Sequence, residues 1–250
     1  MSKTYRLRRR QRLTAIESAS FSVKPFETLA LLGPSGCGKS TLLRLIAGLE
    51  QPSAGELRIN NRLIKGPGAD RAMVFQNYTS FPWLTVAGNV EYGLKLQGVT
   101  ASARAGRARF FLDMVKLSGL RDAYPIQLSG GMKQRVAIAR TLASEPELLL
   151  MDEPFGALDA ETRWQMQELL RAIAVKHKIT VVLVTHDIEE ALYLADRIVL
   201  LDTRPGRDKT IFDLDFKRQP DLSQKEARAD IPEFHRLRKA IMAMMRAAVR

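Results

Sequence analysis

The feature that most constrains this chain is a glycine-rich octapeptide, GPSGCGKS at residues 33–40, which matches the pattern G-x-x-x-x-G-K-[ST] in full. An apolar run, Thr28–Leu32, precedes it, and a segment with helical periodicity, Thr41–Leu49, follows it. A strand, a tight loop and a helix in that order form the context in which this pattern binds phosphate. The segment therefore predicts a nucleotide-binding α/β protein.

The residue types in the loop suit a polyphosphate. Glycines at 33, 36 and 38 let successive backbone N–H groups turn inward, and the following helix adds the positive end of its dipole. Lys39 supplies an ammonium group for the β- and γ-phosphates, the Ser40 hydroxyl suits Mg²⁺, and Thr41 can bond an α-phosphate oxygen. The N–H groups around Cys37 predict a lowered thiol pKa. The candidate nucleotide-binding residues are Gly33, Pro34, Ser35, Gly36, Cys37, Gly38, Lys39, Ser40 and Thr41.

A second apolar strand supplies acidic residues. The run Leu148–Met151 is followed by Asp152 and Glu153. Asp152 is predicted to hold Mg²⁺ or its water shell, and Glu153 is the candidate base for the attacking water. Alone, two acids after a strand indicate only an exposed strand end. Downstream of a phosphate loop they predict nucleoside triphosphate binding and hydrolysis.

Residues 128–134 read LSGGMKQ, and they predict a further anion-binding element. Ser129 suits the N-cap of the helix that follows, and Gly130 and Gly131 leave the N–H groups of that N-terminus open to an anion. An ordinary capped helix start is the alternative interpretation. Two phosphate-binding elements cannot easily serve one nucleotide within one subunit, so the pair favours a head-to-tail dimer.

The remaining patterns predict how the chain is organised. Further strands are expected at 72–75, 180–184 and 198–201, with helices at 160–177 and 188–195, a hairpin at 55–64 and a helix-rich block at about 85–143. The expected fold is α/β: a P-loop ATPase core with a mostly parallel sheet, an antiparallel β-subdomain and an inserted helical subdomain. The domains expected are an ATP-binding core at 1–79 and 144–214, a helical subdomain at 80–143, and a basic tail at 215–250 that ends in a helix.

Charge and composition exclude several classes of protein. The formal net charge is +12, but residues 13–214 are nearly balanced, with 24 basic and 22 acidic residues. The excess lies at the two ends of the chain, whereas a nucleic-acid-binding domain more often gathers it on one folded face. The single cysteine suits a reducing compartment. We find no apolar segment of membrane-spanning length, so we expect a protein inside the cell.

With these motifs in order, the chain resembles the ATP-binding subunit of an ABC (ATP-binding cassette) transporter. GPSGCGKST resembles the Walker A motif of that family, LLLMDE resembles Walker B, and LSGGMKQR resembles its signature motif. The resemblance implies that Gln76 contacts Mg²⁺, that Asp159, in a GALD segment, lies along the dimer interface, and that His186 contacts the γ-phosphate. ATP and Mg²⁺ are the cofactors it implies.

The resemblance narrows to bacterial importers of the nitrate, sulfonate and taurine group. The segments 81–86 (FPWLTV) and 195–207 are similar to that group. This implies an ATPase subunit at the cytoplasmic face of the inner membrane, paired as a homodimer or with a related ATPase. Its partners would be an integral membrane permease, docked beside Pro82 and Trp83, and an extracytoplasmic solute-binding protein.

Two departures from the family pattern accompany the resemblance. Only three residues after Met1 precede Tyr5, the candidate for stacking on adenine, so the strand expected before it is missing or shortened. Phe26 occupies a turn position where the family commonly has glycine, which predicts a slightly weakened turn.

Two other functions stay open at this stage. One is a soluble ABC protein acting on nucleic acid or ribosomes, although the chain lacks a second cassette and a long coiled-coil insertion. The other is a phosphate-loop kinase, which gives His186 and Asp159 no role. The transported solute, the identity of the permease and the roles of the arginine run at 6–12 and of the C-terminal tail are not determined by the sequence.

Overall fold

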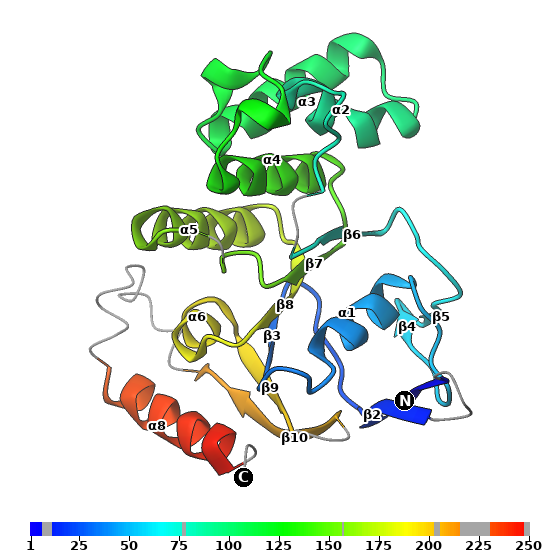
Figure 1. The fold of residues 1–250 in the computed structure, drawn as a ribbon, viewed down its shortest axis with the longest axis vertical. Helices are drawn as coiled ribbons and strands as arrows, with labels where there is room; N and C mark the ends of the chain where they lie inside the picture. The colour runs from blue at the N-terminus through cyan, green and yellow to red at the C-terminus, as the bar shows by residue number, and fades with distance from the viewer. Residues whose placement is uncertain (7–11, 77–78, 157, 203–205, 216–230, 248–250) are drawn as a thin grey trace. The chain divides into compact units, whose positions relative to one another are not determined.

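The computed structural model describes residues 1–6, 12–76, 79–156, 158–202, 206–215 and 231–247 (Figure 1). Most of the arginine run and the first part of the C-terminal tail lie outside the described residues. The chain forms two compact units, one made of Met1–Gly68 with Thr180–Arg250 and the other of Ala69–Ile179. The division into units reflects how densely the residues pack against one another. The domain boundaries expected from the sequence stay a prediction.

The first unit contains most of the sheet. Its buried centre is β3, which pairs in parallel with β8 on one side and with β9 on the other. Antiparallel pairs lie beyond β9, because β10 runs antiparallel to β9 and β1 runs antiparallel to β2. The strands of this unit, in spatial order, are β1 (Lys3–Arg6), β2 (Arg12–Ser18), β10 (Gly206–Asp213), β9 (Arg197–Leu201), β3 (Thr28–Leu32) and β8 (Thr180–Thr185).

Helices and a hairpin complete the first unit. α1 (Lys39–Ala47) follows β3, α6 (Ile188–Leu194) follows β8, and α8 (Pro232–Ala247) is the last described helix. The predicted hairpin is present as β4 (Arg58–Ile59) and β5 (Arg62–Leu63). Asn60 and Asn61 turn it with φ of 48° and 62°, a backbone conformation that asparagine tolerates in tight hairpin turns.

The second unit combines two parallel strands with four α-helices. β6 (Arg71–Val74) pairs with β7 (Leu148–Asp152), all five of whose residues are buried. Helices α2, α3 and α4 contact one another, as the helix-rich block of the sequence predicts. The helices are α2 (Val86–Leu96), α3 (Ala101–Met114), α4 (Gly130–Ala143) and α5 (Ala160–Lys176), with 3₁₀ turns at Ser118–Leu120 and Pro125–Gln127.

Both departures from the family pattern have a structural counterpart. Tyr5 lies inside a strand of four residues, β1, so the expected strand is shortened rather than missing. Phe26 has φ of 64° in the turn before β3, a conformation that favours glycine. No helix among the described residues is long and apolar enough to cross a bilayer.

Candidate nucleotide-binding site

The phosphate loop connects β3 to α1 in the first unit. Gly36 and Gly38 have φ of 81° and 95°, so each adopts a conformation that a residue with a side chain rarely takes. A Cβ atom at Gly33 would lie 2.8 Å from the Cys37 sulfur and 2.9 Å from the Leu201 carbonyl oxygen. The loop therefore has glycine where its backbone turns most tightly, which suits a backbone that cradles phosphate oxygens.

Lys39 and Cys37 are enclosed by this loop. The Lys39 side chain donates hydrogen bonds to the carbonyl oxygens of Gly33 and Pro34, at 2.7 and 2.9 Å, and the residue is 6% exposed. Burial raises the pKa of the Cys37 thiol, and the nearby Lys39 ammonium only partly opposes that rise. The lowered pKa predicted for Cys37 is therefore wrong, because desolvation outweighs the field of the loop.

His186 lies at the same sheet edge as the phosphate loop. Leu32 of β3 and Thr185 of β8 are paired in parallel, so Gly33 and His186 each follow the last residue of neighbouring strands. His186 is exposed, and the next residue, Asp187, is the N-cap of α6: its carboxylate accepts hydrogen bonds from the N–H groups of Glu189 and Glu190. This cap, one residue after His186, defines the start of α6.

Tyr5 lies in the same unit, close to the first turn of α1. Its hydroxyl donates a 2.5 Å hydrogen bond to Glu50, and the Thr41 hydroxyl is a further hydrogen-bonding neighbour. Burial and the bond to Glu50 raise the pKa of the Tyr5 phenol. The Lys3 ammonium lies 4.9 Å from the ring centroid. The structure thus places Tyr5 near the phosphate loop, and its stacking on adenine stays a prediction.

In the second unit, two predicted site residues are in contact. Val74 of β6 pairs with Met151 of β7, and Gln76 and Glu153 each follow two residues later. The Gln76 amide donates a 3.2 Å hydrogen bond to the Glu153 carboxylate. Glu153 has φ of 46°, a strained turn immediately after a buried strand, and Asp152 is 5% exposed. The turn and this bond thus place the Glu153 carboxylate beside the Gln76 amide at the end of β7.

The N-termini of α4 and α5 lie side by side in this unit. The Ser129 hydroxyl caps α4 by accepting a bond from the Met132 N–H at 3.3 Å, which confirms the predicted cap. A Cβ atom at Gly131 would lie 3.1 Å from the Leu158 side chain. Asp159 caps α5 through the Thr162 N–H, a bond that lowers the pKa of Asp159. Ala157, within the GALD segment, lies outside the described residues.

The residues of the candidate site have the chemical groups that ATP and Mg²⁺ require. The phosphate cradle has no room for side chains at Gly33 and Gly38, where an added Cβ would lie 2.8 Å and 2.7 Å from its nearest neighbours. The candidate metal donors, Ser40, Gln76 and Asp152, offer the hydroxyl, amide and carboxylate oxygens that Mg²⁺ prefers.

Comparison with known proteins decides the family. Residues 16–156, more than half of the chain, match the family model described as ABC transporter. The chain belongs to the ABC transporter family. An ATP-binding cassette solved as a dimer in a post-hydrolysis state with ADP and Pi has a TM-score of 0.77 at 34% identity, over 85% of this chain and 96% of that one.

Curated members of the ABC family are similar over most of their length. An uncharacterised ABC transporter ATP-binding protein of Methanocaldococcus jannaschii is 53% identical over 86% of this chain and 80% of its own. The nitrate import ATP-binding protein NrtD of Synechocystis is 50% identical over 79% of this chain and 74% of its own. The taurine import ATP-binding protein TauB of Burkholderia thailandensis is 49% identical over 84% and 81%.

These findings confirm the predicted family, the predicted fold class and the prediction of an ATPase. No comparison tests the individual site residues, so their roles in this ABC subunit remain predictions. Residue patterns and the family resemblance predicted them, and the structure adds which of them lie together within each unit.

Two further residues of this ABC subunit escaped the sequence analysis. Asn89, on α2, is fully buried; its side chain accepts a bond from the Phe81 N–H and donates to the carbonyl oxygens of Phe81, Leu84 and Thr85. Arg140, on α4, donates to the Thr79 carbonyl and hydroxyl oxygens and lies over the Phe81 ring. A polar residue on an otherwise apolar helix face was the one signal for Asn89. No local pattern marked Arg140.

Proposed function

We propose that this chain is the ATP-hydrolysing subunit of an ABC importer for a small anion of the nitrate, sulfonate and taurine type. The observation that carries the catalytic part is the Glu153 carboxylate, which lies directly after a buried strand and accepts a hydrogen bond from Gln76. A carboxylate held in this way can orient or deprotonate the water that attacks the γ-phosphate.

The other proposed roles follow from charge and position. Lys39 and the N-terminus of α4 offset the negative charge that develops on the γ-phosphate, and His186 contacts that phosphate. Ser40, Gln76 and Asp152 would hold Mg²⁺, which when bound neutralises phosphate charge. The loop backbone from Gly33 to Thr41 binds the phosphate groups, and Tyr5 is the candidate for stacking on adenine.

A head-to-tail homodimer, or a pair with a related ATPase, is the proposed active assembly. Ser129, Gly130 and Gly131 of one subunit would cap the nucleotide on the phosphate loop of the other, with Asp159 along the interface. The cassette that resembles this chain and was solved as a dimer with ADP and Pi supports a dimeric assembly. Ser129, which caps α4, is exposed, so the N-terminus of this helix is suited to an anion from outside the subunit.

An aromatic cluster supports docking to a permease. Phe81 lies 5.4 Å from Trp83 and 4.6 Å from Tyr92 between ring centroids, and Trp83 is 69% exposed. Exposed aromatic residues of this kind are enriched at the centres of protein interfaces. We propose that this surface binds the integral membrane permease and so holds the subunit at the cytoplasmic face of the membrane, where an extracytoplasmic solute-binding protein delivers the anion.

Co-purification from native membranes tests the proposal. A C-terminally tagged chain, solubilised mildly with ATP present, is expected to retain a multi-span membrane protein at equal stoichiometry. Trp83→Ala should lose that protein yet keep ATP binding, and Leu96→Ala, on α2 and equally exposed, is the matched control. Nitrate, sulfonates and taurine are then tested as ligands of the binding protein recovered with the complex.

Other outcomes would contradict the proposal. Recovery of ribosomes or nucleic acid without a membrane protein would support a soluble ABC ATPase instead. Phosphate transfer to an acceptor, with no ATP hydrolysis in its absence, would support a kinase.

A further inference from the structure

The last described helix, α8, packs on the first unit through one apolar face. Phe234, Leu237 and Ile241, at helical spacing, are 7%, 9% and 0% exposed, and Met244 and Met245 pack partly against the same cluster. The opposite face carries exposed charged residues. The helix lies outside residues 16–156, which match the family model. The apolar face of α8 is therefore part of the core of the first unit.

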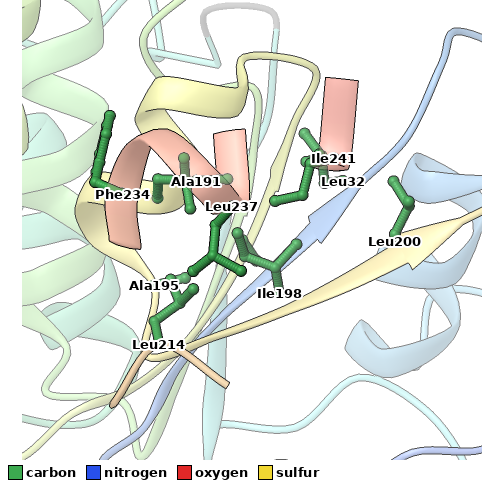
Figure 2. Packing of buried hydrophobic residues seen from close by; sticks show 11 residues of the cluster. Leu32, Ala191, Ala195, Ile198, Leu200, Leu214, Phe234, Leu237 and Ile241 are labelled. Atoms are coloured by element: carbon green, nitrogen blue, oxygen red, sulfur yellow. The ribbon is translucent and has the colours of Figure 1, made fainter. Parts of the chain in front are cut away.

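The surface that receives α8 is α6 together with the strands behind it. The cluster unites the three buried α8 residues with Ala191, Leu192 and Ala195 at α6, and with Ile198 and Leu200 of β9 (Figure 2). In Figure 2 the Leu237 side chain lies among Ala191, Ala195 and Ile198. The small residues of α6 allow the bulky residues of α8 to approach closely.

α6 needs this packing because it is short. It has seven residues, about two turns, and a helix of that length is marginal on its own in water. An ion pair adds a second contact, with the Arg238 guanidinium 3.2 Å from the Glu189 carboxylate in the first turn of α6. Both groups are about half exposed, so the packing contributes more than the ion pair.

The N-terminus of α6 is directly attached to His186. The Asp187 N–H donates to the Thr185 hydroxyl at 3.0 Å, and the Asp187 carboxylate caps α6, so the histidine lies between the end of β8 and the helix cap. A displacement of α6 must therefore move the backbone of His186. The packing of α8 on α6 therefore acts on the helix whose cap residue follows His186 directly in the chain.

We propose that α8 is a positioning element for hydrolysis: Leu237 and Ile241 hold α6, and α6 holds His186 where it contacts the γ-phosphate. The inference rests on the role proposed above for His186. It assigns to the C-terminal helix a part in turnover and none in nucleotide binding, since no residue of α8 belongs to the phosphate loop.

A double-mutant cycle on the purified full chain tests this coupling. Leu237→Ala is expected to lower kcat for ATP hydrolysis on the order of threefold or more and to leave KM for ATP nearly unchanged. In a His186→Ala background the same change should have no further effect, because its route to the phosphate is already lost. The matched control is Leu112→Ala, which opens a cavity beside α3, in the other unit. It should lower kcat only slightly, and by the same factor with and without the His186→Ala change.

A second variant keeps the proposal testable if Leu237→Ala folds poorly. Arg238→Glu faces Glu189 with a like charge and should lower kcat, and the exchanged pair Arg238→Glu with Glu189→Arg should restore it. Equal losses from Leu237→Ala with and without His186, or no loss at all, would overturn the role of α8 alone. Wild-type turnover by His186→Ala would instead overturn the proposed role of His186, and the two failures are thus distinguished.

Discussion

At the scale of single residues, the turn before β3 carries strain that one substitution should relieve. Phe26 has φ of 64° and is 61% exposed, so its ring contributes little packing while its backbone occupies a left-handed conformation. Phe26→Gly should raise the free energy of unfolding by about 1 kcal/mol, measured by urea denaturation. Phe26→Ala keeps the strained backbone and should bring no such gain. A gain from alanine as large as that from glycine would show that the ring, not the backbone, is unfavourable.

Cys37, in the phosphate loop, should make the stability of the protein depend on pH. Burial raises its thiol pKa in the folded state, so above the ordinary thiol pKa, about 8.5, the unfolded chain releases a proton that the folded chain retains. The unfolded state then binds fewer protons, and stability falls as pH rises. Urea denaturation between about pH 7 and pH 10 should show a steeper loss for the natural chain than for Cys37→Ala. Parallel curves would contradict the raised pKa.

At the scale of elements, Asn89 ties the start of α2 to the segment before it. Its side chain makes four hydrogen bonds to backbone groups of residues 81–85, the segment that presents Phe81 and Trp83. Asn89→Ala should destabilise the protein by about 2–3 kcal/mol, because buried backbone groups lose their partners. It should also weaken recovery of the membrane partner. Thr85→Ala, which removes only the α2 cap, is the control; an equal loss of the partner there would assign the effect to the helix rather than to Asn89.

The elements also show what the sequence could and could not predict. The buried strands β3 and β7 contain continuous apolar runs, at residues 29–32 and 148–151, so their pattern identified them. β2 was missed because most of its residues are polar or charged and exposed, as in RLTAIES, where Ile16 is the buried residue. The site motifs were predicted by local spacing. Arg140 and the contact between α6 and α8 depend on residues 61 and about 50 positions apart, which no local pattern encodes.

At the scale of the whole molecule, the proposed dimer depends on how quickly ATP is consumed. In Glu153→Gln the new side-chain carbonyl oxygen can still accept the hydrogen bond from Gln76, but the base is lost. The variant should therefore bind ATP and hydrolyse it very slowly. Size-exclusion chromatography with light scattering should then show an ATP-dependent dimer of Glu153→Gln, and Lys39→Ala, which cannot hold the phosphates, should stay monomeric. Wild-type turnover by Glu153→Gln would end the assignment of Glu153 as the base.

The head-to-tail arrangement makes a stricter prediction. If the phosphate loop of one chain works with Ser129 of the other, then Lys39→Ala and Ser129→Arg chains, each inactive alone, should recover activity when mixed. Each mixed dimer has one intact site of two, so about half of the wild-type ATPase activity per dimer is expected if the sites act independently. Lys39→Ala mixed with the double variant Lys39→Ala, Ser129→Arg contains no intact pair and should stay inactive. Absence of recovery in the first mixture, with mixed dimers demonstrated, would place both motifs on one nucleotide within one chain.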